Sequence, residues 1–275
     1  MSIFESIILG IVQGLTEFIP VSSTAHLLLA QRLLGIDPEM PGVFAYNVLV
    51  QWGTLAALVV FYWADLWRVA RAWLAGIWTR QPFADPDARM GWYLILGSLP
   101  ALAAGYVFKP VVAWLFQLQV YEAIIRLVLT VILLVVAERF GRRSRRLDGF
   151  TWKDALWVGC AQVLAVIPGA SRSGSTIAGG MTRHFDRPSA ARFAFLLSLP
   201  VMFVAGVYES LGLLELPDLA AFLPVMLAGF VSAAAIGYLA IRWLIAYLAK
   251  RSLYDFAIYC AVLAAVSFVL ASVWR

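Results

Sequence analysis

The sequence predicts an all-α integral membrane protein with a single membrane domain over residues 1–275. Hydrophobic residues make up 63% of the 275 residues and charged residues 13%, which is far from the balance of a soluble domain. The apolar residues fall in continuous runs long enough to cross a hydrocarbon core of about 30 Å as helices. Because these runs do not alternate between apolar and polar residues, a β-barrel is disfavoured.

Six apolar runs are predicted to be membrane spans, at residues 43–63, 91–108, 123–137, 193–208, 221–241 and 256–273. Two further stretches, residues 3–34 and 155–181, are apolar but are interrupted by the segments IPVSST and IPGASRSGST. Proline removes a backbone donor and clashes with the preceding helical turn. Each of these two stretches is therefore expected to form a helix hairpin, two short helices joined by a bend.

The basic residues determine the expected orientation. Sixteen of the 21 lie in four gaps between the runs, at residues 65–90, 139–153, 183–192 and 242–251. Loops rich in lysine and arginine stay in the cytoplasm. This rule places both termini outside the cytoplasm and makes both hairpins re-entrant, with the first opening toward the periplasmic side. Topology also accounts for the net charge of +5, so no nucleic-acid partner is expected.

The chain contains a weak internal repeat. A shift of 149 residues aligns GIVQGLTEFIPVSST, from Gly10, with GCAQVLAVIPGASRSG, from Gly159. The two halves, residues 1–140 and 150–275, then each hold one re-entrant hairpin and three spans. An odd number of crossings inverts the second copy, so we predict an inverted-topology repeat whose hairpins meet near the middle of the membrane. The alternative is a chance similarity between apolar segments.

Three ionisable residues lie inside these membrane segments, Glu17, His26 and Arg172. Each costs about 2.5 to 3.5 kcal/mol to insert and therefore needs a reason to be there. Gln13 precedes Glu17 by four residues and shares its helix face. The other polar residues at the two bends are Ser22, Ser23 and Thr24 in the first hairpin and Ser171, Ser173 and Thr176 in the second, next to Gly174.

This arrangement predicts a phosphate or pyrophosphate site. A helix N-terminus carries a partial positive charge and free N–H donors, and two of them would face each other at the bends. Arg172 can grip phosphate through two hydrogen bonds, although a structural ion pair with Glu17 is the alternative. A carboxylate such as Glu17 would repel the anion unless it is protonated, acts as a base, or binds a divalent cation such as Mg²⁺ or Ca²⁺. Glu17 therefore points to catalysis.

The motifs QGLTEFIPVSSTAH and PGASRSGSTI resemble the two signature segments of undecaprenyl-pyrophosphate phosphatases, the bacitracin-resistance family of integral membrane enzymes, and the similarity runs through the whole chain. The resemblance implies hydrolysis of a polyprenyl diphosphate to the monophosphate and inorganic phosphate, which recycles the lipid carrier for cell-wall synthesis. It also implies location in the bacterial inner membrane, an inverted repeat with re-entrant hairpins, and self-association as a homodimer. A secondary transporter or flippase for a phosphorylated lipid is the alternative function.

The resemblance also assigns residues. Glu17 matches the second acid of the acid-rich motif, and the expected catalytic residues are Glu17, Ser23, His26 and Arg172. The expected substrate-binding residues are Gln13, Ser22, Thr24, Ser171, Ser173, Gly174 and Thr176. The chain departs from the family at Gln13, where many members have glutamate, which leaves Glu17 as the strong ligand for a divalent cation. Three nucleophiles remain open: Ser23 with His26 as its base, His26 itself, or water.

Overall fold

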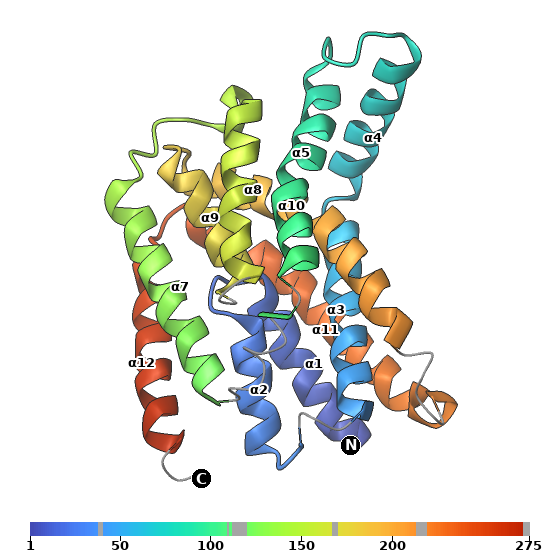
Figure 1. The fold of residues 1–275 in the computed structure, drawn as a ribbon, viewed down its shortest axis with the longest axis vertical. Coiled ribbons are helices and arrows are strands. Elements are labelled where there is room, and N and C mark those ends of the chain that lie inside the picture. Colours follow the sequence, from blue (N-terminus) through green and yellow to red (C-terminus); the bar gives the residue numbers. More distant parts are fainter. Residues whose placement is uncertain (38–40, 109, 112–119, 167–169, 213–218, 272–275) are drawn as a thin grey trace.

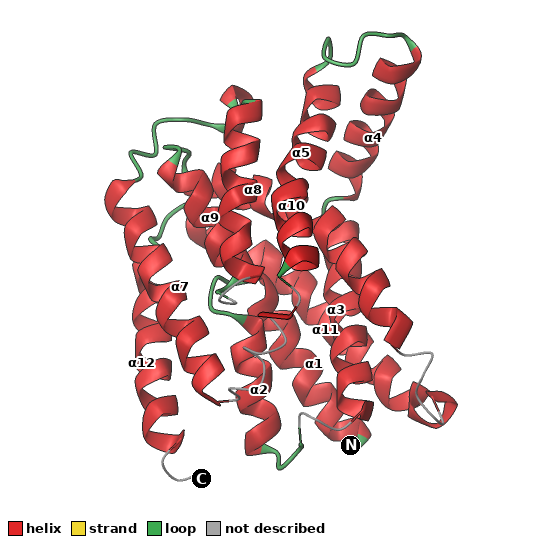
Figure 2. Cartoon of the chain, in the orientation of Figure 1, coloured by secondary structure: helices red, strands yellow, loops and turns green. Residues whose placement is uncertain are grey.

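The computed structural model describes residues 1–37, 41–108, 110–111, 120–166, 170–212 and 219–271, and the regular elements within these ranges are helices (Figure 2). The α-helices are α1 (Ile3–Phe18), α2 (Ser23–Leu33), α3 (Pro41–Phe61), α4 (Trp63–Trp78), α5 (Pro86–Val107), α7 (Val120–Phe140), α8 (Trp152–Val166), α9 (Arg172–Thr182), α10 (Arg187–Ser210), α11 (Leu219–Leu248) and α12 (Tyr254–Ala271). A short 3₁₀ helix, η1 (Leu147–Gly149), precedes α8. The all-α prediction is confirmed for the described residues.

Five helices in the described part of the chain are long and apolar enough to cross a membrane: α3, α5, α10, α11 and α12. They correspond to five of the six predicted spans, so the chain is a multi-pass membrane protein. The remaining predicted span, residues 123–137, forms most of α7, which has 21 residues. α7 carries Glu122 and Arg126, which form a buried ion pair four residues apart.

The two predicted bends occur where the sequence places them. α1 ends at Phe18, and the chain turns through Ile19, which has an extended backbone, and Ser22, which has a left-handed backbone with φ of 70°, before α2 starts. The second bend lies between α8 and α9 and includes residues 167–169, which are outside the described part. α8 starts 149 residues after α1, and α9 starts and ends 149 residues after α2.

The two helix pairs enter the bundle from opposite ends. Figure 1 shows that α1 starts and α12 ends at one end of the molecule, whereas the links α4–α5, α7–α8 and α9–α10 lie at the other. The α1–α2 pair occupies the first end and the α8–α9 pair the second (Figure 1). The start of α9 contacts the first bend, where Ser173 donates to the backbone oxygen of Ile19.

Glycines bring the first helix of each pair close to a long helix. A Cβ atom at Gly10 of α1 would lie 2.6 Å from the backbone oxygen of Gly229 in α11, and a Cβ atom at Gly159 of α8 would clash with the backbone of Gly97 in α5. Small residues allow such backbone-to-backbone packing between membrane helices. Gly10 and Gly159 are also the first residues of the two similar segments, so both segments have a closely packed glycine at the same position.

The gap between the first two predicted spans contains a helix. Residues 65–90 hold most of α4, and the α4–α5 pair projects beyond the rest of the bundle (Figure 1). α4 is amphipathic: it buries Val69 and Gly76, while Trp67 and Trp78 are exposed. Its arginines and Asp65 interrupt the apolar residues. Continuous apolar runs in the sequence therefore do not predict this helix.

A buried aspartate fixes the connection that leads into α8. Asp154 has a fully buried side chain and accepts hydrogen bonds from Arg145 at 2.7 and 3.0 Å, from Arg183 at 2.8 Å and from Thr151 at 2.7 Å. Burial alone would raise the pKa of this carboxyl, but the donors Arg145, Thr151 and Arg183 together hold its pKa well below its ordinary value. Asp154 lies just before the predicted hairpin at residues 155–181, so this network positions the start of the hairpin.

Asp154→Asn is expected to destabilise the protein by about 2 kcal/mol at pH 7, because two arginines lose a charged acceptor and both are partly exposed. Folding lowers the pKa of Asp154, so its stabilisation is present above an ordinary aspartate pKa of about 4 and is lost as the pH falls toward the folded-state pKa. Thermal unfolding in detergent measures this: the gap between wild type and Asp154→Asn should shrink below about pH 4. An equal gap at every pH would contradict the assignment.

Candidate active site

Glu17, near the end of α1, is the centre of a polar cluster between the two helix pairs. Its Oε2 accepts hydrogen bonds from Gln13 Nε2 at 2.8 Å and from Ser23 Oγ at 2.7 Å, and its Oε1 forms an ion pair with Arg172. The Glu17 side chain is only 6% exposed. A carboxylate so buried needs partners for its charge, and it obtains them from α1, α2 and α9.

Arg172 comes from the second helix pair, as the first residue of α9. Ser171 caps this helix, because its Oγ accepts from the backbone N–H of Gly174 at 3.1 Å. A Cβ atom at residue 174 would lie 3.0 Å from the Ser171 Cβ, so glycine leaves room for the cap. Ser173 donates to the backbone oxygen of Ile19 at 3.3 Å, which joins the α9 N-terminus to the first bend.

Side chains behind the bend hold the start of α9. The backbone N–H of Ser171 donates to Thr130 Oγ1 of α7 at 3.1 Å, and Thr176 Oγ1 donates to the backbone oxygen of Arg172 at 2.8 Å. Ser171, Ser173 and Thr176 are all buried. Thr130 was not among the predicted residues, because nothing in the sequence indicates that α7 packs against this bend.

The remaining predicted residues are placed around the first bend. Ser22 is buried and precedes the first residue of α2, but its side chain makes no capping hydrogen bond. Thr24 is exposed and lies outside the contacts described above. His26 is near Ser22 and Tyr259: Nδ1 lies 2.8 Å from the Ser22 backbone oxygen, and Nε2 lies 2.8 Å from the Tyr259 hydroxyl. The hydroxyl of Ser23 donates to Glu17. The described contacts of His26 are with Ser22 and Tyr259, and not with Ser23.

A second carboxylate lies near Arg172. Glu209, near the end of α10, is close enough for its charge to interact with that of Arg172, and its side chain is partly buried. Glu209 is not among the predicted site residues, because it lies at the end of a predicted span, where an acidic residue needs no special explanation. Its place near Arg172 depends on how α10 packs against α9.

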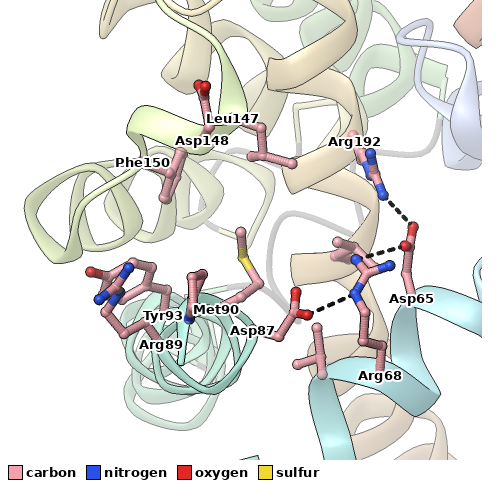
Figure 3. A pocket seen from close by; sticks show the side chains of 13 residues that line it. Asp65, Arg68, Asp87, Arg89, Met90, Tyr93, Leu147, Asp148, Phe150 and Arg192 are labelled. Carbon is pink, nitrogen blue, oxygen red and sulfur yellow. Dashed lines mark hydrogen bonds and ion pairs between the residues drawn. The ribbon is translucent and has the colours of Figure 1, made fainter. Parts of the chain in front are cut away.

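A cavity of about 270 Å³ lies away from this cluster, between α4, α5, α10 and the loop around η1 (Figure 3). Its charged side chains pair with one another: Arg68 Nε is 2.8 Å from Asp87 Oδ2, and Arg192 is 2.7 Å from Asp65, which also pairs with Arg68 (Figure 3). These ion pairs tie three helices together at the base of the α4–α5 pair. The cavity is not the predicted phosphate site.

The fit of a divalent cation to the cluster depends on oxygen donors. No group of three or more His, Cys, Asp or Glu side chains suited to a metal ion occurs in the ranges that the structure describes. Glu17 and Gln13 supply one carboxylate and one amide oxygen. Mg²⁺ is often bound by one or two carboxylates together with substrate phosphates. These residues therefore fit a cation that is held jointly by the protein and a diphosphate, and they do not form a complete protein cage.

The fold and this cluster together define a class of protein. It is a multi-pass helical membrane protein in which two interrupted helix pairs bring a buried carboxylate and an arginine together at helix N-termini. Such ends attract anions.

Comparisons with known proteins agree with this class. A family model described as Bacitracin resistance protein BacA matches residues 6–266. An undecaprenyl-diphosphatase of Chloroherpeton thalassium is 42% identical over 269 residues, which cover 94% of this chain and 93% of that protein. The proteins of the same name from Anaeromyxobacter sp. and Thermomicrobium roseum are 41% and 40% identical and cover 94% and 100% of this chain, and 88% and 100% of their own lengths. The chain belongs to the bacitracin resistance protein BacA family.

Proposed function

We propose that this chain is a membrane-embedded undecaprenyl-diphosphatase, which hydrolyses undecaprenyl diphosphate to the monophosphate and inorganic phosphate. The names of its relatives and the family it belongs to support this activity. The observation that carries the proposal is that Glu17 of α1, Ser23 of α2 and Arg172 of α9 converge in one polar cluster. The reaction returns the lipid carrier to cell-wall synthesis and confers resistance to bacitracin.

The diphosphate binds where α2 and α9 start. The leading N–H groups of a helix lack intrahelical acceptors and attract anions, and Ser171 and Ser173 add hydroxyl groups at the second of these starts. Arg172 grips the terminal phosphate and stabilises the charge that develops on it during transfer. The polyprenyl tail stays in the bilayer, so the protein needs to enclose only the head group.

Binding of phosphate to Arg172 activates Glu17. Phosphate oxygens compete with Glu17 for the guanidinium, and a carboxylate that loses a cationic partner becomes a stronger base. Ser23 donates to this carboxylate at 2.7 Å, the geometry of a nucleophile and its base. In this route Ser23 Oγ bonds to the terminal phosphorus, its proton moves to Glu17, and the monophosphate leaves with the bridging oxygen. Water then hydrolyses the phosphoserine.

Two other nucleophiles remain part of the proposal. Direct attack by water, with Glu17 as its base, gives the same products without a phosphoserine. His26 is the third nucleophile, or alternatively a general acid for the departing monophosphate. Rapid quenching of turnover separates these routes, because Ser23 attack predicts an acid-stable phosphoserine and His26 attack an acid-labile phosphohistidine.

A divalent cation, Mg²⁺ or Ca²⁺, is part of the proposal. Holding this cation together with the diphosphate is the alternative role of Glu17 to that of base, and Gln13 could contribute its amide oxygen. When bound, the cation would neutralise phosphate charge. Chelation followed by readdition of each metal tests the requirement.

The proposed architecture is an inverted-topology repeat of residues 1–140 and 150–275 in the bacterial inner membrane. The matching helix positions at an offset of 149 residues and the glycine contacts of α1 and α8 support it. The entry of the two helix pairs from opposite ends supports it as well (Figure 1). With the arginine-rich links in the cytoplasm, the α1–α2 hairpin opens to the periplasm. Self-association as a homodimer is also proposed.

Phosphate release by purified protein tests the activity. In detergent, the wild-type protein should release inorganic phosphate from undecaprenyl diphosphate and leave the monophosphate. The same half-helix architecture occurs in secondary transporters. Tight binding of the diphosphate without release of phosphate would therefore contradict the phosphatase and favour a carrier or flippase.

A further inference from the structure

Each ring nitrogen of His26 has a hydrogen-bond partner. Nδ1 lies 2.8 Å from the backbone oxygen of Ser22, and Nε2 lies 2.8 Å from the hydroxyl of Tyr259 on α12. The two rings are stacked, with centroids 5.6 Å apart and an angle of 12° between their planes. Tyr259 is 233 residues away from His26 in the chain, so the contact joins the first helix pair to the last helix.

These two contacts determine where His26 carries its proton. A backbone oxygen only accepts hydrogen bonds, so Nδ1 must be the donor to Ser22. In the neutral ring Nε2 is then unprotonated and accepts from the Tyr259 hydroxyl. The tautomer follows from the hydrogen-bond network. Nε2 is therefore the nitrogen at which His26 gains or loses a proton.

α12 holds Tyr259 in place against the first bend. Cys260, the next residue, is buried, and its Sγ lies 3.9 Å from the backbone oxygen of Val21. Val21 is itself buried and immediately precedes Ser22, whose backbone oxygen accepts the hydrogen bond from His26 Nδ1. The two partners of His26 are thus held in one packed unit, and the ring cannot change its orientation without losing a hydrogen bond.

Tyr259 is a polar residue on an apolar surface. The other large side chains exposed along this part of α12 are Ile258, Val262, Val266, Phe268 and Val269. Such a surface suits lipid, in which a hydroxyl without a partner is costly. Phenylalanine would pack there as well as tyrosine. The specific contribution of the Tyr259 hydroxyl is therefore its contact with His26 Nε2.

We propose that Tyr259 is a positioning residue of the phosphatase reaction, which acts by fixing the orientation and the tautomer of His26. The inference rests on the proposed function and on a part for His26 in it. Tyr259 keeps Nε2 as the basic nitrogen at the start of α2, one turn from Ser23. Removal of the hydroxyl leaves the Ser22 oxygen as the one remaining hydrogen-bond partner of those two, so the orientation and the tautomer of the ring are held less firmly. This slows the step that uses His26 without weakening phosphate binding.

A double-mutant cycle tests the proposal. Purified wild type, Tyr259→Phe, His26→Ala and the double variant are assayed with undecaprenyl diphosphate. Tyr259→Phe should lower kcat about tenfold and leave KM within about twofold, and His26→Ala should lower kcat about 100-fold or more. In the double variant, Tyr259→Phe should cause no further loss. Tyr254→Phe, on the exposed start of α12, is the control and should match wild type.

The proposal is overturned if Tyr259→Phe retains wild-type kcat, or if its effect multiplies with that of His26→Ala. Absence of phosphate release by wild type would instead overturn the proposed function. A second measurement, on His26 in a protein that keeps Tyr259, does not depend on the folding of the Tyr259→Phe variant. The chain has two histidines, so ¹⁵N-histidine labelling, with His184→Gln for assignment, reports the tautomer directly. The proposal requires a proton on Nδ1 of neutral His26, and a proton on Nε2 would contradict it.

Discussion

Arg172→Ala is expected to abolish turnover, with a loss of kcat/KM of about 1,000-fold or more. Arg172 supplies the guanidinium at the meeting of the two bends, and removal of a donor aimed at a transferred phosphoryl group typically costs a factor of about 1,000 or more. Arg172→Lys keeps the charge but loses the planar fork, so it should recover only part of the activity. Phosphate release by purified protein measures the effect.

The matched control is Arg192→Ala, which removes an arginine that is ion-paired with Asp65 on another helix, away from the cluster. It should leave turnover within about threefold of wild type, because partly exposed ion pairs contribute little. Thermal unfolding of both variants checks that they are folded. If Arg172→Ala kept more than a tenth of wild-type activity while folded, Arg172 would not bind the reacting phosphate.

Glu17→Gln is expected to lower kcat about 100-fold or more, since the amide has the shape of the acid but cannot act as a base. The same change should tighten the binding of inorganic phosphate. Glu17 pairs with Arg172, so removal of its charge leaves the guanidinium free for the product. Loss of kcat together with stronger phosphate inhibition is a combination that general destabilisation would not produce.

Glu122→Gln is the control for this second prediction. Glu122 is also a buried acid paired with an arginine, Arg126, but it lies on α7 outside the cluster. We expect Glu122→Gln to lower stability and to leave inhibition by phosphate unchanged. A Glu17→Gln protein with wild-type kcat would show that the carboxylate is a structural partner of Arg172 and nothing more.

The helix breaks could be predicted because their causes are local. Pro20 and Pro168 are each followed by small polar residues, and this combination favours the end of one helix and the start of another. Proline alone is not sufficient, because Pro100, Pro200 and Pro224 lie inside continuous helices. The repeat then indicated that the two breaks correspond. The free-energy cost of burying a charge indicated the site residues, because an arginine and a glutamate at membrane depth need partners. Glu17 and Arg172 are partners in the structure.

The contacts that could not be predicted from the sequence depend on packing between distant helices. Nothing near His26 in the sequence identifies Tyr259, and Glu209 reaches Arg172 only because α10 packs beside α9. Apolar runs indicate that helices exist, but not which faces meet. The pairing of Ser23 with His26 is one of three routes that the sequence leaves open, and it depends on sequence proximity in the same way. In the structure, the Ser23 hydroxyl donates to Glu17.

Cross-linking across the two bends tests most directly whether they form one phosphate site. Ser173 donates to the backbone oxygen of Ile19 at 3.3 Å, so cysteines at positions 19 and 173, in a chain with Cys160 and Cys260 replaced by serine, should react together with a short thiol cross-linker. Undecaprenyl diphosphate should slow this reaction, whereas undecaprenol, which lacks the phosphates, should not. Failure of the two cysteines to cross-link, or equal rates with and without the diphosphate, would contradict the account.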